Sequence, residues 1–422
     1  MWNTIIRIFK TKNLRDRIIF TLAMLVIFRI SVSIPIPGVD KENLIRFLSN
    51  NQFFGLLNIF SGGALNNLSV GMLGLGPYIT ATIIFQLLTM IFPGLKEMYQ
   101  EDGEAGRKKF NQYARFLSLP LAALQGFGLL KLLESQNIIN LTNFNLFLNV
   151  IVIMAGTSFL MWLGELISEK GISNGISLLI AGGIIAGFPQ ALKRVLATFT
   201  QADISGYLMF LVIAFLTIVF VVIITEAQRN IPIQYAKRVR GFKLYGGVST
   251  YLPLRLNMAG VIPIIFAISV LLFPSVIANL IGLFKIQWLL SASSAVVRFF
   301  QNPWIYGSSY FFLVVVFTYF YTAVTFDPKQ MSENLQKQGG FIPGIRPGQP
   351  TAFTINFILN RITLSGALFL GIIAVLPYIV TGVSGISSLS LGGTSLLILV
   401  SVILEIAKQI KAQISMTDYE RI

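Results

Sequence analysis

The hydrophobic positions of the chain form a series of long apolar runs, separated by polar segments rich in glycine, proline and basic residues. A helix needs about 20 predominantly apolar residues to cross a bilayer, with tolerance for tilt and flanks. The runs that meet this need centre on Ile18–Ser33, Leu75–Phe92, Phe116–Leu133, Leu148–Leu166, Ile176–Leu196, Tyr207–Thr225, Met258–Leu283, Tyr306–Phe326, Ile362–Val380 and Thr394–Ile410. The pattern therefore predicts an all-α polytopic membrane protein with ten transmembrane helices.

Three of these runs carry features that qualify the prediction. Pro189 breaks the second half of the fifth run, and Pro263 should remove one helix hydrogen bond from the seventh, leaving a weak point there. The first run follows a basic arm and superficially resembles a secretory signal peptide. Arg29 interrupts that run and nine more runs follow, so we expect it to stay as a span in which Arg29 snorkels toward the outer surface.

Composition supports a membrane protein and excludes several chemistries. Hydrophobic residues make up 55% of the 422 residues and charged residues 12%, against about 25% charged in a typical soluble domain. The chain contains no cysteine and no histidine, which excludes disulfides, Cys/His metal sites and Ser-His-Asp triads. It also contains no phosphate-binding GxxxxGK[S/T] motif. We predict no catalytic residue, no metal site and no cofactor.

The net charge of +15 is unevenly distributed along the chain. Most lysines and arginines fall in an N-terminal arm (residues 1–17), in alternate loops and in a C-terminal tail (412–422), which predicts that both termini are cytoplasmic. The loops predicted to lie outside contain only Lys41, Arg46, Lys131, Lys193, Arg194, Lys285 and Arg298.

Two predicted inside loops, 227–257 and 327–361, are unusually long for helix connections, which indicates a function or disorder. Their proline and glycine residues favour fixed turns, because proline presets φ and glycine adopts conformations closed to other residues. We therefore expect two ordered, basic loops that protrude into the cytoplasm.

Polar side chains inside the spans are mainly uncharged, as at Thr80, Thr82, Gln86 and Asn257. They indicate either ordinary hydrogen bonding between helices or a polar seam between two helices that part. The glutamates Glu165, Glu226 and Glu405 lie near predicted cytoplasmic ends, so the spans lack the buried ionisable groups that mark an ion pathway. This absence argues against a proton- or sodium-coupled transporter.

Several segments together resemble one family, the bacterial SecY subunit of the protein-conducting channel. They occur in order along nearly the whole chain: GPYITATIIFQLL, EDGEAGRKKFNQYAR, GISNGISLLIAGGIIAG, IPIQYAKRVRG, LPLRLNMAGVIPIIFA, GGFIPGIRPG, LNRITL and GGTSLLI. The resemblance implies two pseudo-symmetric halves, residues 18–200 and 201–411, around a central pore. It also implies a re-entrant plug at about 53–70, where the segment is too apolar for a surface loop and too broken for a span.

Site residues follow from this resemblance position by position. The family's hydrophobic pore ring falls on Leu75, Ile79, Ile180, Ile184, Ile265 and Ile398, with Leu75 departing from the usual isoleucine. The lateral gate between the second and seventh spans brings in Thr80, Gln86 and Asn257. The plug includes Phe60, Gly62, Gly63, Asn66 and Asn67, which we expect to be poorly helical and weakly held. Docking of the ribosome is implied for Arg238, Arg240 and Lys243, and coupling to the motor for Arg346.

The resemblance implies a conduit for unfolded secretory polypeptides in the bacterial plasma membrane, which also releases transmembrane segments laterally into lipid. The implied partners are the small membrane subunits SecE and SecG, the SecA motor ATPase, the ribosome, and signal sequences with their nascent chains. A secondary transporter of a small solute remains the alternative. An enzyme acting on lipid is a third possibility, which no catalytic constellation supports.

Overall fold

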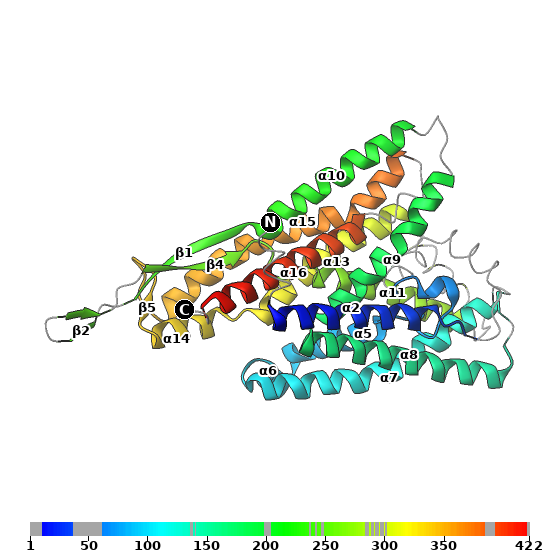
Figure 1. Ribbon diagram of the computed structural model, residues 1–422, viewed down its shortest axis with the longest axis horizontal. Helices are drawn as coiled ribbons and strands as arrows, with labels where there is room; N and C mark the ends of the chain where they lie inside the picture. Colours follow the sequence, from blue (N-terminus) through cyan, green and yellow to red (C-terminus); the bar gives the residue numbers. More distant parts are fainter. Residues whose placement is uncertain are drawn as a thin grey trace.

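The computed structural model describes residues 11–36, 61–135, 138–139, 141–197, 204–235, 238–240, 243–245, 249–282, 302–384 and 393–419, with residues 287, 291, 295 and 299 as isolated positions. Most of it is a bundle of helices that run roughly along one axis (Figure 1). Each predicted span coincides with one helix. These helices are α2 (Lys12–Ser33), α5 (Gly76–Ile91), α7 (Gly103–Ser135), α8 (Asn143–Lys170), α9 (Gly175–Ala197), α10 (Ile204–Glu226), α11 (Ile262–Gly282), α13 (Pro303–Thr325), α15 (Gln349–Ser384) and α16 (Gly393–Tyr419).

Several of these helices have the length and apolarity that a membrane span requires. Among the described residues, four ranges qualify: Gly103–Glu134, Asn143–Lys170, Trp304–Lys337 and Gln349–Leu376. A fifth results if α5 and α6 (Pro93–Gln100), which meet at an angle of 115°, count as one broken span. The bend follows from Pro93, because the residue before a proline avoids the helical region and Phe92 is extended. The protein is thus multi-pass, and the count of ten spans stays a prediction.

The weak point predicted at Pro263 is wrong. Helix α11 begins at Ile262, so Pro263 lies in its first turn, where the backbone N–H has no partner within the helix in any case. The proline inside this helix is Pro274. In the fifth predicted span, α9 continues through Pro189, so the break expected there does not end the helix.

The two long loops fold together into one unit, which the sequence analysis did not foresee. The first loop forms a hairpin of β1 (Gln228–Tyr235) and β4 (Ser249–Arg255), and the second contributes α14 (Pro328–Lys337) and β5 (Gly340–Phe341). Strand β5 pairs with β1 on the side away from β4. The described residues also include a separate short pair, β2 (Arg238–Arg240) and β3 (Lys243–Tyr245).

A small hydrophobic core holds this unit together. Its buried side chains come from both loops and from α15: Ile231, Ile233, Leu254, Leu335, Ile342, Ile355 and Ile362. The unit projects from one end of the bundle, the same end at which α2 begins and α16 finishes (Figure 1). Helix α15 already starts at Gln349, so the irregular part of the second loop is shorter than the predicted 327–361.

Candidate functional site

The six predicted pore-ring residues lie in one hydrophobic cluster. They come from the start of α5, from α9, from the first turns of α11 and from α16. Five of them are buried, and Ile184 is half-buried and packs against the same cluster. All six therefore belong to the main hydrophobic core of the bundle, which also includes residues of α2, α8, α13 and α15, and the ring stays a prediction.

The predicted plug is described only from Ser61 onward, and Phe60 lies outside the described residues. The described part returns into the bundle through a short 3-10 helix, η1 (Ala64–Asn67), which contains Asn66 and Asn67. It is well packed, since Ser61, Ala64, Leu65 and Leu68 are all at most 1% exposed.

Backbone hydrogen bonds fasten this re-entrant segment to the end of α2. The Ile36 N–H donates to the Leu68 carbonyl at 2.8 Å, and the Val70 N–H donates to the Ile34 carbonyl at 3.0 Å. Helix α8 also approaches closely, because a Cβ at Gly156 would lie 2.1 Å from the Val70 carbonyl oxygen. Tight fastening of residues 61–70 contrasts with the weakly held segment that the sequence analysis expected.

The predicted lateral gate lies between α5 and α11, which contact each other. Thr80 and Thr82 each donate to a carbonyl one turn earlier in their own helix, at 2.9 Å. Gln86 and Asn257 are buried, and the Gln86 Oε1 and Asn257 Oδ1 atoms have no hydrogen-bond partner. No hydrogen bond joins these two side chains, although Asn257 Nδ2 donates to the Gly260 carbonyl at 3.2 Å. The threonines thus fit ordinary helix packing, while the two amides leave buried polar oxygens without a hydrogen bond.

The predicted docking residues lie on the unit built by the two loops. Arg346 is exposed in the turn between β5 and α15. Three features shape this turn: Ser332 Oγ donates to the Gly348 carbonyl at 2.6 Å, Thr351 Oγ1 donates to the Arg346 carbonyl at 2.9 Å, and Gly348 takes a φ of +95°. Arg238, Arg240 and Lys243 belong to β2 and β3, and their side chains lie outside the described part of the structure.

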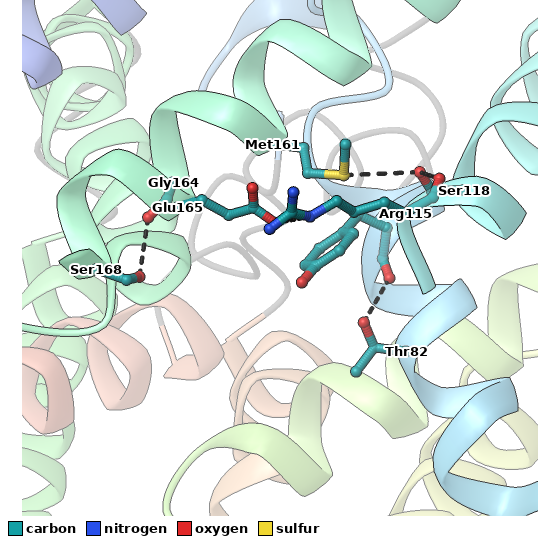
Figure 2. A network of polar contacts seen from close by, with 8 residues as sticks. Thr82, Arg115, Ser118, Met161, Gly164, Glu165 and Ser168 are labelled. Atoms are coloured by element: carbon teal, nitrogen blue, oxygen red, sulfur yellow. Dashed lines mark hydrogen bonds and ion pairs between the residues drawn. The ribbon is translucent and has the colours of Figure 1, made fainter. Parts of the chain in front are cut away.

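An ion pair between α7 and α8 was not predicted from the sequence. The Arg115 Nε forms an ion pair with a Glu165 carboxylate oxygen, and Figure 2 shows the two side chains extended toward each other. Glu165 is the more buried partner, so its charge depends on the guanidinium for compensation. The only sequence signal was a glutamate close to the end of an apolar run.

Two further links join helices that are distant in sequence. Gln100 Nε2 at the end of α6 donates to the Val324 carbonyl near the end of α13 at 2.8 Å, which connects the two predicted halves. Lys408 on α16 pairs with Glu226 at the end of α10 at 3.0 Å. Among the described residues, no group of three or more acidic, histidine or cysteine side chains is placed to bind a metal ion.

Solved structures with similar folds are channels. One described as "The structure of a protein conducting channel" aligns with a TM-score of 0.66, covering 94% of this chain and 91% of that chain at 18% identity. Another, "Sec61 in the Canine ribosome-channel complex from the endoplasmic reticulum", aligns with a TM-score of 0.62 over the same shares at 18% identity. At this level of identity the matches establish the fold.

Sequence comparisons point the same way. The SecY family model matches residues 69–407. A protein translocase subunit SecY of Streptomyces galbus is 43% identical over 98% of both chains, and the one from Thermotoga maritima is 42% identical over 100% of this chain and 97% of its own. The chain belongs to the SecY family.

Proposed function

We propose that the chain is the pore-forming subunit of a protein-conducting channel. It passes unfolded secretory polypeptides across the membrane and releases transmembrane segments laterally into lipid. The observation that supports this proposal is that four different helices bring apolar residues at the predicted ring positions into the core of the bundle: Leu75, Ile79, Ile180, Ile184, Ile265 and Ile398. An apolar constriction offers a passing polypeptide no fixed binding site and dewets when empty, so it holds back ions. A solute transporter would instead need polar or charged ligands at this depth.

The chain is not an enzyme, so the driving force comes from partners. We propose that SecA or the ribosome docks on the unit formed by β1, β4, β5 and α14 and on the β2–β3 pair beside it in sequence, with SecE and SecG as small membrane neighbours. Phosphate attraction to Arg238, Arg240 and Lys243 suits ribosomal RNA. The proposed location is the bacterial plasma membrane, with both termini and this unit in the cytoplasm, in agreement with the charge asymmetry of the chain.

Replacement of a ring residue by a polar one tests the pore. We expect Ile398→Asn to raise the ion conductance of the resting channel in planar bilayers, because a hydrated side chain at the constriction opposes dewetting. The matched control is Ile185→Asn on α9, next in sequence to Ile184 but 55% exposed on the surface of the bundle. A mutant at Ile398 that is as tight as the unmodified channel contradicts the seal.

Charge reversal in the docking turn tests the coupling to a motor. We expect Arg346→Glu to abolish ATP-dependent translocation in vesicles reconstituted with the motor, while the protein stays folded and its resting conductance is unchanged. Lys337→Glu on α14 reverses an exposed charge of the same unit and is the control. Unimpaired translocation by the Arg346 variant contradicts the coupling role.

A further inference from the structure

Arg29 is a charged residue within an apolar helix, and the proposed function does not explain why a charge is present there. It lies on α2, four residues before the helix ends, in the sequence AMLVIFRISVS. A charge at this depth is costly unless a polar partner or water compensates it. Among the described residues, no carboxylate forms an ion pair with Arg29. Its compensation must come from another polar group.

The compensating group is a backbone carbonyl of the re-entrant segment. Arg29 Nη1 donates to the Gly62 carbonyl oxygen at 2.9 Å, in a part-buried position. This bond uses one of the five guanidinium N–H donors, so snorkelling of Arg29 toward the outer surface stays a prediction. A charge-assisted hydrogen bond of this kind is roughly twice as strong as a neutral one.

The carbonyl reaches Arg29 because residue 62 is a glycine. Gly62 takes a φ of +69°, a conformation that other residues rarely adopt. A Cβ at this position would lie 2.8 Å from Phe28 Cζ and 3.1 Å from the Gly183 Cα. The Gly62 backbone is therefore wedged between α2 and α9, with its oxygen facing the guanidinium.

This contact point is adjacent to the pore ring in sequence and in space. Gly183 lies on α9 between Ile180 and Ile184, two of the predicted ring residues. A displacement of α9 that widens the ring would remove the backbone surface on which Gly62 rests. The hydrogen bond from Arg29 would then remain as a contact that holds Gly62 against α2.

We infer that Arg29 is a positioning residue that, together with the backbone hydrogen bonds to Ile34 and Ile36, holds the re-entrant segment 61–70 in its closed place. It does so by donating to the Gly62 carbonyl, so the bond depends on the backbone course of the segment and not on a side chain there. This inference rests on the proposed function, in which that segment is part of the plug. Loss of one charge-assisted hydrogen bond should raise the equilibrium constant for displacement of the segment from its closed position by roughly tenfold or more.

The test replaces Arg29 by methionine and measures two properties of the full chain reconstituted with its partners. Met is unbranched like the stem of Arg, carries no donor and inserts readily into lipid, so folding should not suffer. We expect Arg29→Met to raise the resting ion conductance about tenfold. We also expect a cysteine placed at Ser61, which is 1% exposed, to become about tenfold more reactive toward a membrane-impermeant maleimide added from outside. The absence of native cysteines makes this labelling specific.

Two further variants separate the hydrogen bond from Arg29 to the Gly62 carbonyl, called the latch below, from a general effect of charge. Lys131 pairs with Glu134 on its own helix at 2.8 Å, so Lys131→Met removes another outer charge and should leave both readouts unchanged. Arg29→Lys, which retains a donor on a shorter side chain, should lie between the methionine variant and the unmodified channel. The inference is overturned if Arg29→Met leaves the cysteine protected, whether or not conductance rises.

A separate measurement keeps the proposed function distinct from the latch. Motor-driven translocation of a secretory polypeptide is measured in the same vesicles. If the Arg29→Met variant translocates the polypeptide while the cysteine of Ser61→Cys stays unlabelled, the latch is rejected and the channel function is retained. Absence of translocation in the unmodified protein rejects the channel itself.

Discussion

Polar side chains between helices fall into two groups in this molecule. Gln86 on α5 and Asn257, five residues before α11 begins, are buried, and each leaves one side-chain oxygen without a hydrogen bond. At three helix contacts the polar groups are bonded across the interface: α7 with α8 through Arg115 and Glu165, α6 with α13 through Gln100, and α10 with α16 through Lys408 and Glu226.

The difference shows how unsatisfied polar groups can make part of a tight bundle easier to open; Asn149 and Thr157 on α8 also leave side-chain oxygens without a hydrogen bond. A buried oxygen without a hydrogen bond costs free energy in the closed state and regains a partner when the helices part. A bonded pair has the opposite effect, because separation leaves both groups unsatisfied. If the gate opens between α5 and α11 as predicted, these two unsatisfied oxygens should favour its opening, while the bonded contacts resist relative movement of their helices.

The largest effect is expected when the Arg115–Glu165 pair is broken. Arg115→Ala should destabilise the protein by about 1–3 kcal/mol, because the Glu165 carboxylate, whose side chain is 19% exposed, loses its charged partner. Thermal unfolding of the purified protein in detergent measures this change. Glu104→Ala is the control, since its pair with Lys108 is highly exposed and should contribute nothing measurable. If both variants lower the unfolding temperature equally, the partly buried pair contributes no more to stability than the exposed pair, and the prediction is wrong.

Filling the seam with an apolar side chain should have the next largest effect. Gln86→Leu removes an unsatisfied oxygen and should stabilise the closed contact by about 1–2 kcal/mol. Export of substrates with weak signal sequences should then fall by about tenfold in a translocation assay. Thr80→Val, which removes a hydroxyl already bonded within its own helix, should change export little. Faster export by Gln86→Leu would contradict this effect of the unsatisfied oxygens.

Removal of the link across the two halves should act in the opposite direction. Gln100→Ala deletes the hydrogen bond to the Val324 carbonyl, worth about 0.5–1.5 kcal/mol, and should ease separation of α6 from α13. Export of the same weak substrates should rise several-fold. Gln112→Ala, at an exposed position on α7, is the matched control. Reduced export by the Gln100 variant would show that this link does not oppose opening.

The smallest effect is expected at the α10–α16 pair. Lys408 and Glu226 are 31% and 47% exposed, so solvent screens most of their attraction. Lys408→Met should lower the free energy of unfolding by less than about 1 kcal/mol, and the loss should shrink as salt is raised. A large loss of unfolding free energy that does not change with salt would contradict this, because it would show that the pair is a strong, unscreened contact.

Sequence reasoning located the helices well because a span depends on local length and apolarity. All ten predicted runs coincide with helices, and the family was recognised from motifs along the chain. The reasoning failed at Pro263, where the helix start decides the effect of proline, and at the two long loops, where the strands were missed. Their turns were visible as Pro and Gly, but β1 consists of mixed polar and apolar residues that gain stability only from β4 and β5.

The sequence by itself determined the apolar helices, the asymmetry of charge and the membership of the family, since each is a property of composition or of local pattern. Only the tertiary structure decided that the two loops share one core, that Arg115 meets Glu165 and that Arg29 meets the carbonyl of Gly62. Each of these contacts joins residues tens of positions or more apart. A hydrogen bond depends on distance and direction to within a fraction of an ångström and some tens of degrees, and packing of the whole chain sets both.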